Sequence, residues 1–401
     1  MHSSSRVPLI DTIKVVAAQL IVLHHLAWFG PMSDVAATAS PLLSTGQSWL
    51  AEYGRYAVAA FLAVAGYLAA QSLSPRGLPH DKSPLQMIIQ RYLRLVGPYA
   101  VALLLAMASA AIARQWMVHD SIGAAPAFWQ FFAHLFLLHD LLDFEALSAG
   151  VWYIAMDFQL YALLVLLLWV ARHTRYGAFH PASTDFTGPP RSQPRLAAPH
   201  EITRSGDGGA EVGLGRPGTD FVGPLLVLII ALASLFFFNQ RDAWDATALY
   251  FFGAYALGVG SSWAVQSARP YWFLSLLALI GVTALWFDFR PRIAVALVVA
   301  LMLGLAQLHL RTRGNRGSEL LASLGRMSYA LFLVHFPVCL IVNAVFHQLA
   351  PHDPQWNALG ILLAWAASNL AAIVFYRQVE LRLSALWRKR AHPGQQAQPV
   401  N

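Results

Sequence analysis

Apolar residues recur in long runs along nearly the whole chain. Ten of these runs are close to the length of about 20 residues that a helix needs to cross a hydrocarbon layer of about 30 Å. The two-residue alternation of membrane-spanning strands is absent. The pattern therefore predicts an all-α, polytopic transmembrane bundle of about ten helices, with spans at residues 10–30, 49–73, 95–113, 150–171, 222–239, 246–265, 271–287, 292–310, 320–346 and 357–376.

Residues 126–144 (PAFWQFFAHLFLLHDLLDF) do not fit this series of spans. The segment is apolar and aromatic but contains two histidines and two aspartates. Counted as an additional span, it would move every later loop to the opposite side of the membrane, including the arginine-rich segment 172–221. We therefore expect an interfacial or re-entrant helix here, because polar groups at membrane depth need protein or water around them.

The composition agrees with a membrane protein and narrows its chemistry. Of the 401 residues, 57% are hydrophobic and 12% are charged, which is more apolar than a soluble domain of this size can hide. The 27 Lys and Arg exceed the 20 Asp and Glu, and this excess falls mainly in loops that lie inside when both termini are cytoplasmic. We therefore expect no nucleic-acid binding. The single cysteine, Cys339, leaves no disulfide or thiolate cluster, and we predict no metal site.

Three regions bear on the domain organisation. Residues 177–220 are rich in Gly, Pro, Ser and Arg and have little apolar periodicity, which favours a disordered cytoplasmic loop. Residues 381–401 form a basic cytoplasmic tail, so the transmembrane domain covers residues 1–380 and is interrupted by the loop. The start of the chain has features of a secretory signal, but Asp11, Lys14 and two histidines in its apolar run favour a retained first helix.

Two adjacent histidines, His24 and His25, stand inside the first apolar run. Lys14 precedes His25 by eleven residues, about three helical turns, so the two share one helix face, and Asp11 lies one turn before Lys14. Ionisable groups inside a membrane are costly and mark functional sites, and burial favours a neutral imidazole that can accept a proton. We expect His25 to be a general base, with a structural hydrogen bond between helices as the alternative; for His24 the structural role is favoured.

Two arginines, Arg91 and Arg94, stand one helical turn apart in the stretch RYLRLVGPY, at the cytoplasmic end of the third span. Two guanidinium groups at this spacing can hold the phosphates of a nucleotide-containing donor. Arginines at a membrane edge also serve topology and contact lipid headgroups, and the spacing alone favours that simpler role.

Polar residues also interrupt the later spans. Asp157 lies in the stretch GVWYIAMDFQLY with Tyr161 one turn on, and it has three possible roles: to orient His25, to bind an acceptor hydroxyl, or to make a structural hydrogen bond. Ser328 and His335 share one face of the helix GRMSYALFLVHFP. Arg377 and Glu380 stand one turn apart in YRQVE, where a structural salt bridge is favoured over catalysis.

Taken in order, these motifs resemble the acyltransferase-3 family of bacterial membrane O-acyltransferases. The resemblance runs from IDTIK through the membrane histidine, FLAVAGY, RYLRLVGPY, WYIAMDFQLY and GRMSYALFLVHFP to YRQVE, over residues 10–380. It implies a ten-helix enzyme of the bacterial inner membrane that moves an acyl group, usually acetyl, from cytoplasmic acyl-CoA as co-substrate to a saccharide hydroxyl. The partners so implied are the lipid bilayer, acyl-CoA and the saccharide, with no permanently bound cofactor.

The resemblance also assigns roles to individual residues. The family's essential histidine falls on His25, its paired arginines on Arg91 and Arg94, and its carboxylate on Asp157. The chain departs from the family pattern at three positions, with Lys14 in place of arginine, Asp157 in place of glutamate and Ala65 in place of serine.

Within this mechanism, we expect His25 to take the proton of the acceptor hydroxyl while Asp157 or Asp11 orients its ring, and Arg91 and Arg94, with Lys14 nearby, to hold the donor. A covalent acyl-histidine intermediate and a succinyl donor fit the sequence equally well. Two other classes remain as alternatives, namely a proton-coupled transporter that uses the buried polar groups as a relay and an inactive scaffold. The sequence specifies neither the acceptor sugar nor the oligomeric state.

Overall fold

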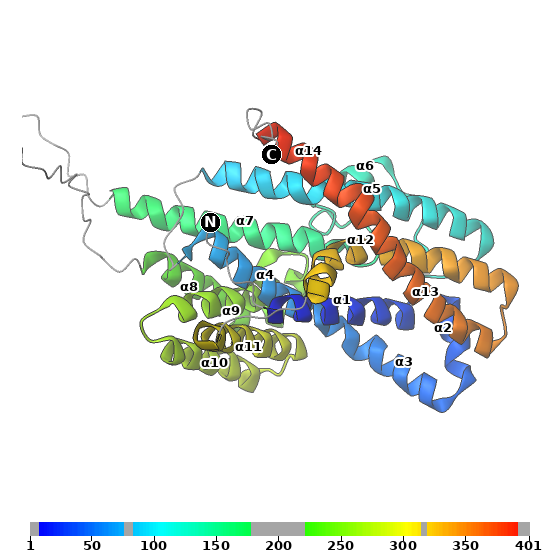
Figure 1. Cartoon of the computed structure of the whole chain (residues 1–401), viewed down its shortest axis with the longest axis horizontal. Coiled ribbons are helices and arrows are strands. Elements are labelled where there is room, and N and C mark those ends of the chain that lie inside the picture. Colours follow the sequence, from blue (N-terminus) through cyan, green and yellow to red (C-terminus); the bar gives the residue numbers. More distant parts are fainter. Residues whose placement is uncertain (1–7, 76–82, 178–220, 314–318, 392–401) are drawn as a thin grey trace, which may run out of the picture.

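The computed structural model describes residues 8–75, 83–177, 221–313 and 319–391 (Figure 1). These residues form helices without any strand, and ten helical segments among them are long and apolar enough to span a membrane. This confirms the predicted all-α bundle of about ten helices. The helices are α1 (Pro8–Trp28), α2 (Pro31–Ala36), α3 (Pro41–Tyr53), α4 (Ala57–Leu73), α5 (Pro84–Trp116), α6 (Phe128–Leu135), α7 (Val151–Gly177), α8 (Val222–Phe236), α9 (Ala248–Gln266), α10 (Pro270–Phe287), α11 (Pro291–Arg313), α12 (Glu319–Leu349), α13 (Pro354–Phe375) and α14 (Leu381–Ala391).

Three of the ten spans are longer than the apolar runs that predict them. The second joins α3 and α4 in one segment, Pro41–Leu73, and α5 begins at Pro84, well before residue 95. The tenth continues from α13 through a π-helical turn, Tyr376–Glu380, into α14. The additional turns contain many polar residues, which the hydropathy pattern does not count as membrane. The predicted tail therefore begins as a helix, whereas residues 392–401 and the predicted loop after Gly177 lie outside the described residues.

Proline marks both the starts of helices and two interior positions. Pro31, Pro41, Pro84, Pro270 and Pro354 occupy first-turn positions, where the missing N–H has no helical partner to lose. Pro98 in α5 and Pro337 in α12 lie inside helices, and each removes one backbone hydrogen bond. Both interior prolines lie within four residues of a candidate site residue.

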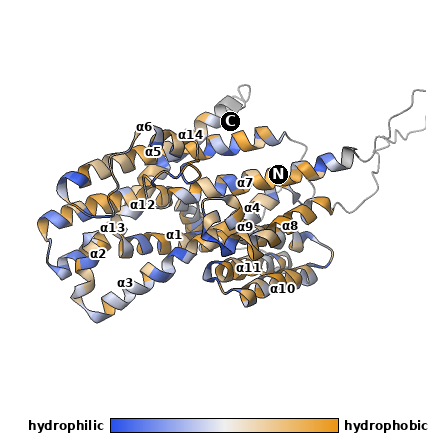
Figure 2. Ribbon diagram, turned by 180° about the vertical axis from the view of Figure 1, so that it is seen from behind, coloured by the Kyte–Doolittle hydropathy of each residue, from blue (hydrophilic) through white to orange (hydrophobic). Residues whose placement is uncertain are grey.

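The centre of the bundle is formed by α4, α9 and α12, whose spans are the most buried, while α10 lies at the periphery. The helix α1 packs against α3, α4 and α12. Figure 2 shows hydrophobic residues along most of the helices and hydrophilic residues mainly near their ends and in the connections. The candidate residues of α1 and α12 therefore lie on two helices that face each other inside the bundle.

The helices α4 and α9 cross at two glycines. A Cβ at Gly66 would collide with the carbonyl oxygen of Tyr255, and a Cβ at Gly258 would collide with that of Ala63. Small residues of this kind let two membrane helices approach until their backbones touch. The close crossing brings α9 and its Tyr255 against the part of α4 that carries the FLAVAGY stretch.

The short helix α6 and the turns after it occupy the segment 126–144. The hydroxyl of Tyr92 donates to the carbonyl of Leu135 at 3.0 Å, and the side chain of Gln159 donates to that of Leu137 at 3.3 Å. Tyr92 lies 24 residues, or about 36 Å, before the end of α5. The tip of the segment therefore packs beside α5 and α7, about 12 Å along α7 from its first residue, which favours the re-entrant form over the interfacial one.

This re-entrant segment turns on a leucine in the left-handed conformation. Leu137 has φ 60°, the amide of Leu137 donates to the carbonyl of His134, and the amide of Leu138 donates to that of Ala133, both at 2.9 Å. These two bonds form a Schellman motif, in which the left-handed position is usually glycine. Leu137 is 1% exposed, so burial of its side chain offsets the strain of the turn.

Two buried histidines stack behind this turn. The rings of His134 and His139 lie 4.0 Å apart at 12°, and His134 is held by the carbonyl of Gln130 and the amide of Leu147. The ring nitrogens of His139 have no hydrogen-bond partner among the described residues, and Nε2 lies 3.6 Å from Asp140 Oδ2. Burial lowers the pKa of His139 to about 3 and raises the pKa of Asp140 to about 6, so His139 is neutral at physiological pH.

Candidate active site

The candidate base, His25, lies in the last turn of α1 and is 8% exposed. Its Nδ1 lies 2.6 Å from Nε2 of His335, which is fully buried on α12. The two rings are parallel within 3°, with centroids 4.9 Å apart. With the two nitrogens 2.6 Å apart, the ring centres can lie 4.9 Å apart only if both centres and both nitrogens lie on one line. The hydrogen bond therefore lies in the planes of both rings, as a good hydrogen bond requires.

Aromatic side chains close around this histidine pair. The ring of Phe29 lies 5.4 Å from that of His25 and the ring of Phe336 lies 6.3 Å from it, both edge-on. His24 turns away and bonds the carbonyl of Leu50 in α3 through Nδ1 at 3.1 Å. His24 therefore joins two helices, the structural role that the sequence favours for it.

The structure brings neither expected carboxylate to His25. Asp157 forms an ion pair with Arg91, Oδ2 to Nη2 at 2.5 Å. Asp11 precedes His25 by fourteen residues, about 21 Å along α1, and packs against α12, where a Cβ at Gly325 would lie 2.6 Å from its Oδ1. Among the described residues, the hydrogen-bond partner of the His25 ring is another imidazole.

The Arg91–Asp157 pair joins α5 to α7 inside the bundle. The side chain of Asp157 is 10% exposed and that of Arg91 is 32% exposed. The guanidinium carbon also lies 5.1 Å from the ring centre of Tyr161, a distance that suits a cation–π contact. Asp157 and Tyr161, which share one face of α7, thus both contact Arg91, and its guanidinium neutralises the buried carboxylate.

Charged groups from α1, α5 and the π-helical turn meet near the start of α1. Glu380, in the π-helical turn, interacts electrostatically with Arg94 of α5 and Lys14 of α1, and its Oε2 is buried without a hydrogen-bond partner in the described part of the chain. Arg377, which was expected to form a salt bridge with Glu380, is exposed and is not among these neighbours. The π-helical turn is what redirects the pair, because it breaks the regular one-turn spacing between them. We call Lys14, Arg94 and Glu380 the inner cluster.

The remaining candidate on α12 is locally satisfied. The hydroxyl of Ser328 donates to the carbonyl of Gly325 at 2.9 Å, and Ser328 lies seven residues, about 10 Å along the helix, from His335. Ser328 shares a helix face with His335 without contacting the histidine pair. Tyr329, which sequence reasoning missed, donates its hydroxyl to the carbonyl of Leu95 at 3.1 Å and so joins α12 to the arginine-bearing part of α5.

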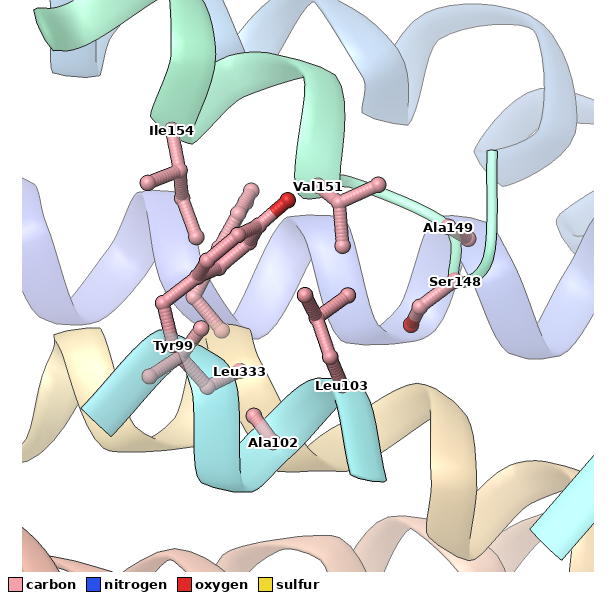
Figure 3. A pocket seen from close by; sticks show the side chains of 9 residues that line it. Tyr99, Ala102, Leu103, Ser148, Ala149, Val151, Ile154 and Leu333 are labelled. Atoms are coloured by element: carbon pink, nitrogen blue, oxygen red, sulfur yellow. The ribbon is translucent and has the colours of Figure 1, made fainter. Parts of the chain in front are cut away.

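A small pocket lies between α5, the start of α7 and α12 (Figure 3), and neither His25 nor His335 lines it. Phe332 lines it, and the ring of Phe332 is 6.1 Å from that of His335. Tyr99 projects into the pocket toward Val151 (Figure 3), and its hydroxyl is fully buried without a hydrogen-bond partner in the described residues. Tyr99 was also missed, although it is the last residue of the RYLRLVGPY stretch.

The described residues contain no group of three or more His, Cys, Asp or Glu side chains that could hold a metal ion. The polar groups gathered here are imidazoles, guanidiniums, an ammonium, hydroxyls and the carboxylates of Asp157 and Glu380. Such groups can accept a proton, bind anionic oxygen and hydrogen-bond an alcohol, which together suit transfer between two organic groups.

Residues 7–181 match a protein-family model described as an acyltransferase domain. This part of the chain is similar to the acyltransferase-3 family. No curated protein and no solved structure matches it. This acyltransferase is a multi-pass membrane protein, and the matched part contains Lys14, His25, Arg91, Arg94 and Asp157. His335 and Glu380 lie beyond it, on α12 and the π-helical turn, which pack against the matched part.

Proposed function

We propose that this membrane acyltransferase moves an acyl group, acetyl in the simplest case, from cytoplasmic acyl-CoA to a hydroxyl of a cell-envelope or exported saccharide. The expected location is the bacterial inner membrane with both termini in the cytoplasm, since ten spans leave the two ends on the same side and the arginine-rich loops favour the inside.

The observation that carries the proposal is the placement of a buried imidazole and a cationic group on one face of α1. Lys14 and His25 lie eleven residues, about 16 Å, apart along the helix, and Arg94 joins Lys14 at Glu380. An acyl-CoA donor likewise has its phosphates at one end of a long arm and its thioester at the other. The inner cluster suits the phosphates, and His25 suits the thioester end.

The reaction then needs one proton acceptor. As the acceptor oxygen attacks the thioester carbonyl carbon, His25 takes its hydroxyl proton; the C–S bond breaks, and the leaving thiolate receives that proton, which gives an ester and free CoA. General-base assistance of this kind is typically worth about 10²–10⁴ in rate. An acyl group carried by His25 itself is the covalent variant of the same reaction, and trapping after addition of donor alone distinguishes the two routes.

The small pocket has room for a single hydroxyl group, and we assign it to one hydroxyl of the acceptor. The buried Tyr99 hydroxyl has no partner among the described residues, so a hydroxyl of the incoming saccharide would satisfy it at little cost. Because Phe332 separates this pocket from His335, the hydroxyl assigned to the pocket is a neighbour of the one that reacts at His25. Arg91 is bound to Asp157, and we assign it to the organisation of the helices around the site, with Arg94 and Lys14 as the donor contacts.

The test compares His25→Ala with His24→Ala in cells that lack the chromosomal copy. We expect His25→Ala to abolish saccharide acylation, because the base is lost, while the protein remains in the membrane. His24→Ala is the matched control, since the neighbouring histidine bonds only a backbone carbonyl of α3, and we expect acylation to continue. Mass spectrometry of surface and exported saccharides measures the acyl increment. An unchanged increment in His25→Ala would refute the proposal.

A further inference from the structure

We propose that His335 is a positioning residue that fixes the tautomer of His25, so that Nε2 of His25 is the atom that receives the proton. The inference rests on the proposed function, in which His25 is the base. It follows from hydrogen-bond donors and acceptors that can be assigned one after another along α12 and α1.

The first assignment concerns His335. Its Nδ1 lies 3.0 Å from the carbonyl oxygen of Leu331, and a carbonyl oxygen can only accept. Nδ1 of His335 must therefore carry the ring proton. A neutral imidazole has one such proton, and full burial beside a second imidazole, with no carboxylate in contact, favours the neutral form. Nε2 of His335 is then a lone-pair acceptor.

The second assignment concerns His25. Its Nδ1 lies 2.6 Å from that acceptor in a common ring plane, so Nδ1 must donate its hydrogen. Neutral His25 then has no proton on Nε2, and this nitrogen keeps a lone pair on the side of the ring away from His335. In this series of hydrogen bonds, His25 donates to His335 and His335 donates to the carbonyl of Leu331. Nε2 of His25, at the other end of the series, is left as the base.

The packing around the pair holds this arrangement in place. Phe29 and Phe336 contact the His25 ring edge-on, which restricts rotation about its side-chain bonds. The ring of Phe332 lies 6.1 Å from that of His335. Rotation of either ring would break the 2.6 Å bond and leave buried nitrogens unpaired, which is costly in an apolar interior.

A histidine performs here the orienting role that a carboxylate performs in serine hydrolases. A carboxylate would also raise the basicity of the ring through its charge, whereas neutral His335 adds no buried charge to desolvate. When His25 takes a proton, its Nδ1–H bond to His335 becomes charge-assisted and stronger. The pair thus selects the reactive nitrogen and stabilises the imidazolium, with no ion in the resting site.

The tautomer can be measured directly by ¹⁵N NMR of histidine-labelled full-length protein in lipid nanodiscs, with His25→Ala used to assign the His25 signals. We expect a protonated, pyrrole-type signal for Nδ1 and an unprotonated, pyridine-type signal for Nε2. In His335→Leu the signals should show a mixture of tautomers. A wild-type spectrum with the proton on Nε2 would overturn the proposal, and this measurement does not depend on the fold of any His335 variant.

The kinetic arm compares two substitutions of His335. His335→Leu should lower kcat by about 10- to 100-fold, in the range seen when an orienting partner is lost, without changing KM for acetyl-CoA. Gln places an amide oxygen near the position of Nε2, so His335→Gln should recover part of kcat. The matched control is Cys339→Ala, buried one turn further along α12, which should behave as wild type.

The outcomes separate this inference from the proposed function. If His335→Leu retains both the wild-type tautomer and kcat while His25→Ala is inactive, the positioning role is wrong and the base assignment stands. If His25→Ala is active, the proposed function fails whatever the tautomer.

Discussion

At the scale of single residues, the pair of Arg91 with Asp157 neutralises charge inside the bundle. Removing one member of a buried pair leaves the other uncompensated, which costs about 3–5 kcal/mol, whereas removing both often costs little. We expect Arg91→Met and Asp157→Leu each to unfold at lower SDS fraction in mixed micelles, and the double variant to unfold later than either single variant.

The control for this cycle is Asp34→Asn, which breaks the His119–Asp34 contact, where the aspartate is 70% exposed. Its unfolding curve should match that of the wild type, because exposed pairs add little stability. If the loss of stability in the double variant equals the sum of the losses in the two single variants, Arg91 and Asp157 do not stabilise each other.

His139 gives a second prediction, in pH dependence. Because its pKa in the folded protein is about 3, against about 6.5 in an unfolded chain, the unfolded state binds one more proton between these values. The contribution of His139 to stability should therefore fall as pH decreases through this window, by up to about 1.4 kcal/mol per pH unit. His139→Phe should lose less thermal stability than wild type between pH 7 and pH 5. Equal losses would contradict the buried, neutral assignment.

The site shows which residue properties the sequence can predict. Regular helical spacing predicted that Lys14 and His25 share one face of α1, since spacing on one helix fixes the shared face. Partners across helices have no such signal. His25 and His335 are 310 residues apart. Orientation of His25 was one of the roles expected for Asp157, whereas Arg91 of α5 is the group that reaches this carboxylate.

At the scale of helices, the crossing of α4 and α9 depends on the absence of side chains at Gly66 and Gly258. Gly66→Val should push the helices apart and lower the apparent Tm in detergent together with acyl transfer, because the new methyl groups would meet the backbone at Tyr255. Gly46→Val is the control, since a Cβ there meets nothing within 4 Å. A Gly66→Val protein with wild-type Tm would show that the crossing is loose.

Hydropathy predicted where the helices lie but not how far they extend. Apolar runs report the part of a helix that faces lipid or core, and the amphipathic first turns of α5 fall outside such a run. For the segment 126–144, the arginine-rich loop that follows left two possibilities, an interfacial or a re-entrant helix. The hydrogen bonds from Tyr92 and Gln159 distinguish the re-entrant form. Contacts of this kind depend on tertiary packing rather than on local pattern.

At the scale of the whole molecule, the site is built from both sides of the segment 178–220. The helices α1, α5 and α7 precede it, and α12 with the π-helical turn follows it. Membrane helices that insert separately can associate by packing alone. We therefore expect a chain divided between residues 198 and 199 to regain acyl transfer when both pieces are co-expressed, and neither piece to be active alone.

The matched control divides the chain at Gly258, inside the most buried span, and should remain inactive. The readout is co-purification of an affinity-tagged first piece with the second, followed by the acyl-transfer assay. Activity of the first piece by itself would show that α12 contributes nothing to the reaction.

The long separation of the two histidines also affects biosynthesis. The proton acceptor gains its partner only after the ninth span has left the ribosome and packed against the first. Under the proposed mechanism, a nascent or truncated chain lacks His335. It is therefore exposed to cytosolic acyl-CoA before its His25 can activate an alcohol or a water molecule. Wasteful hydrolysis by unfinished molecules is thereby avoided, without a separate inhibitor.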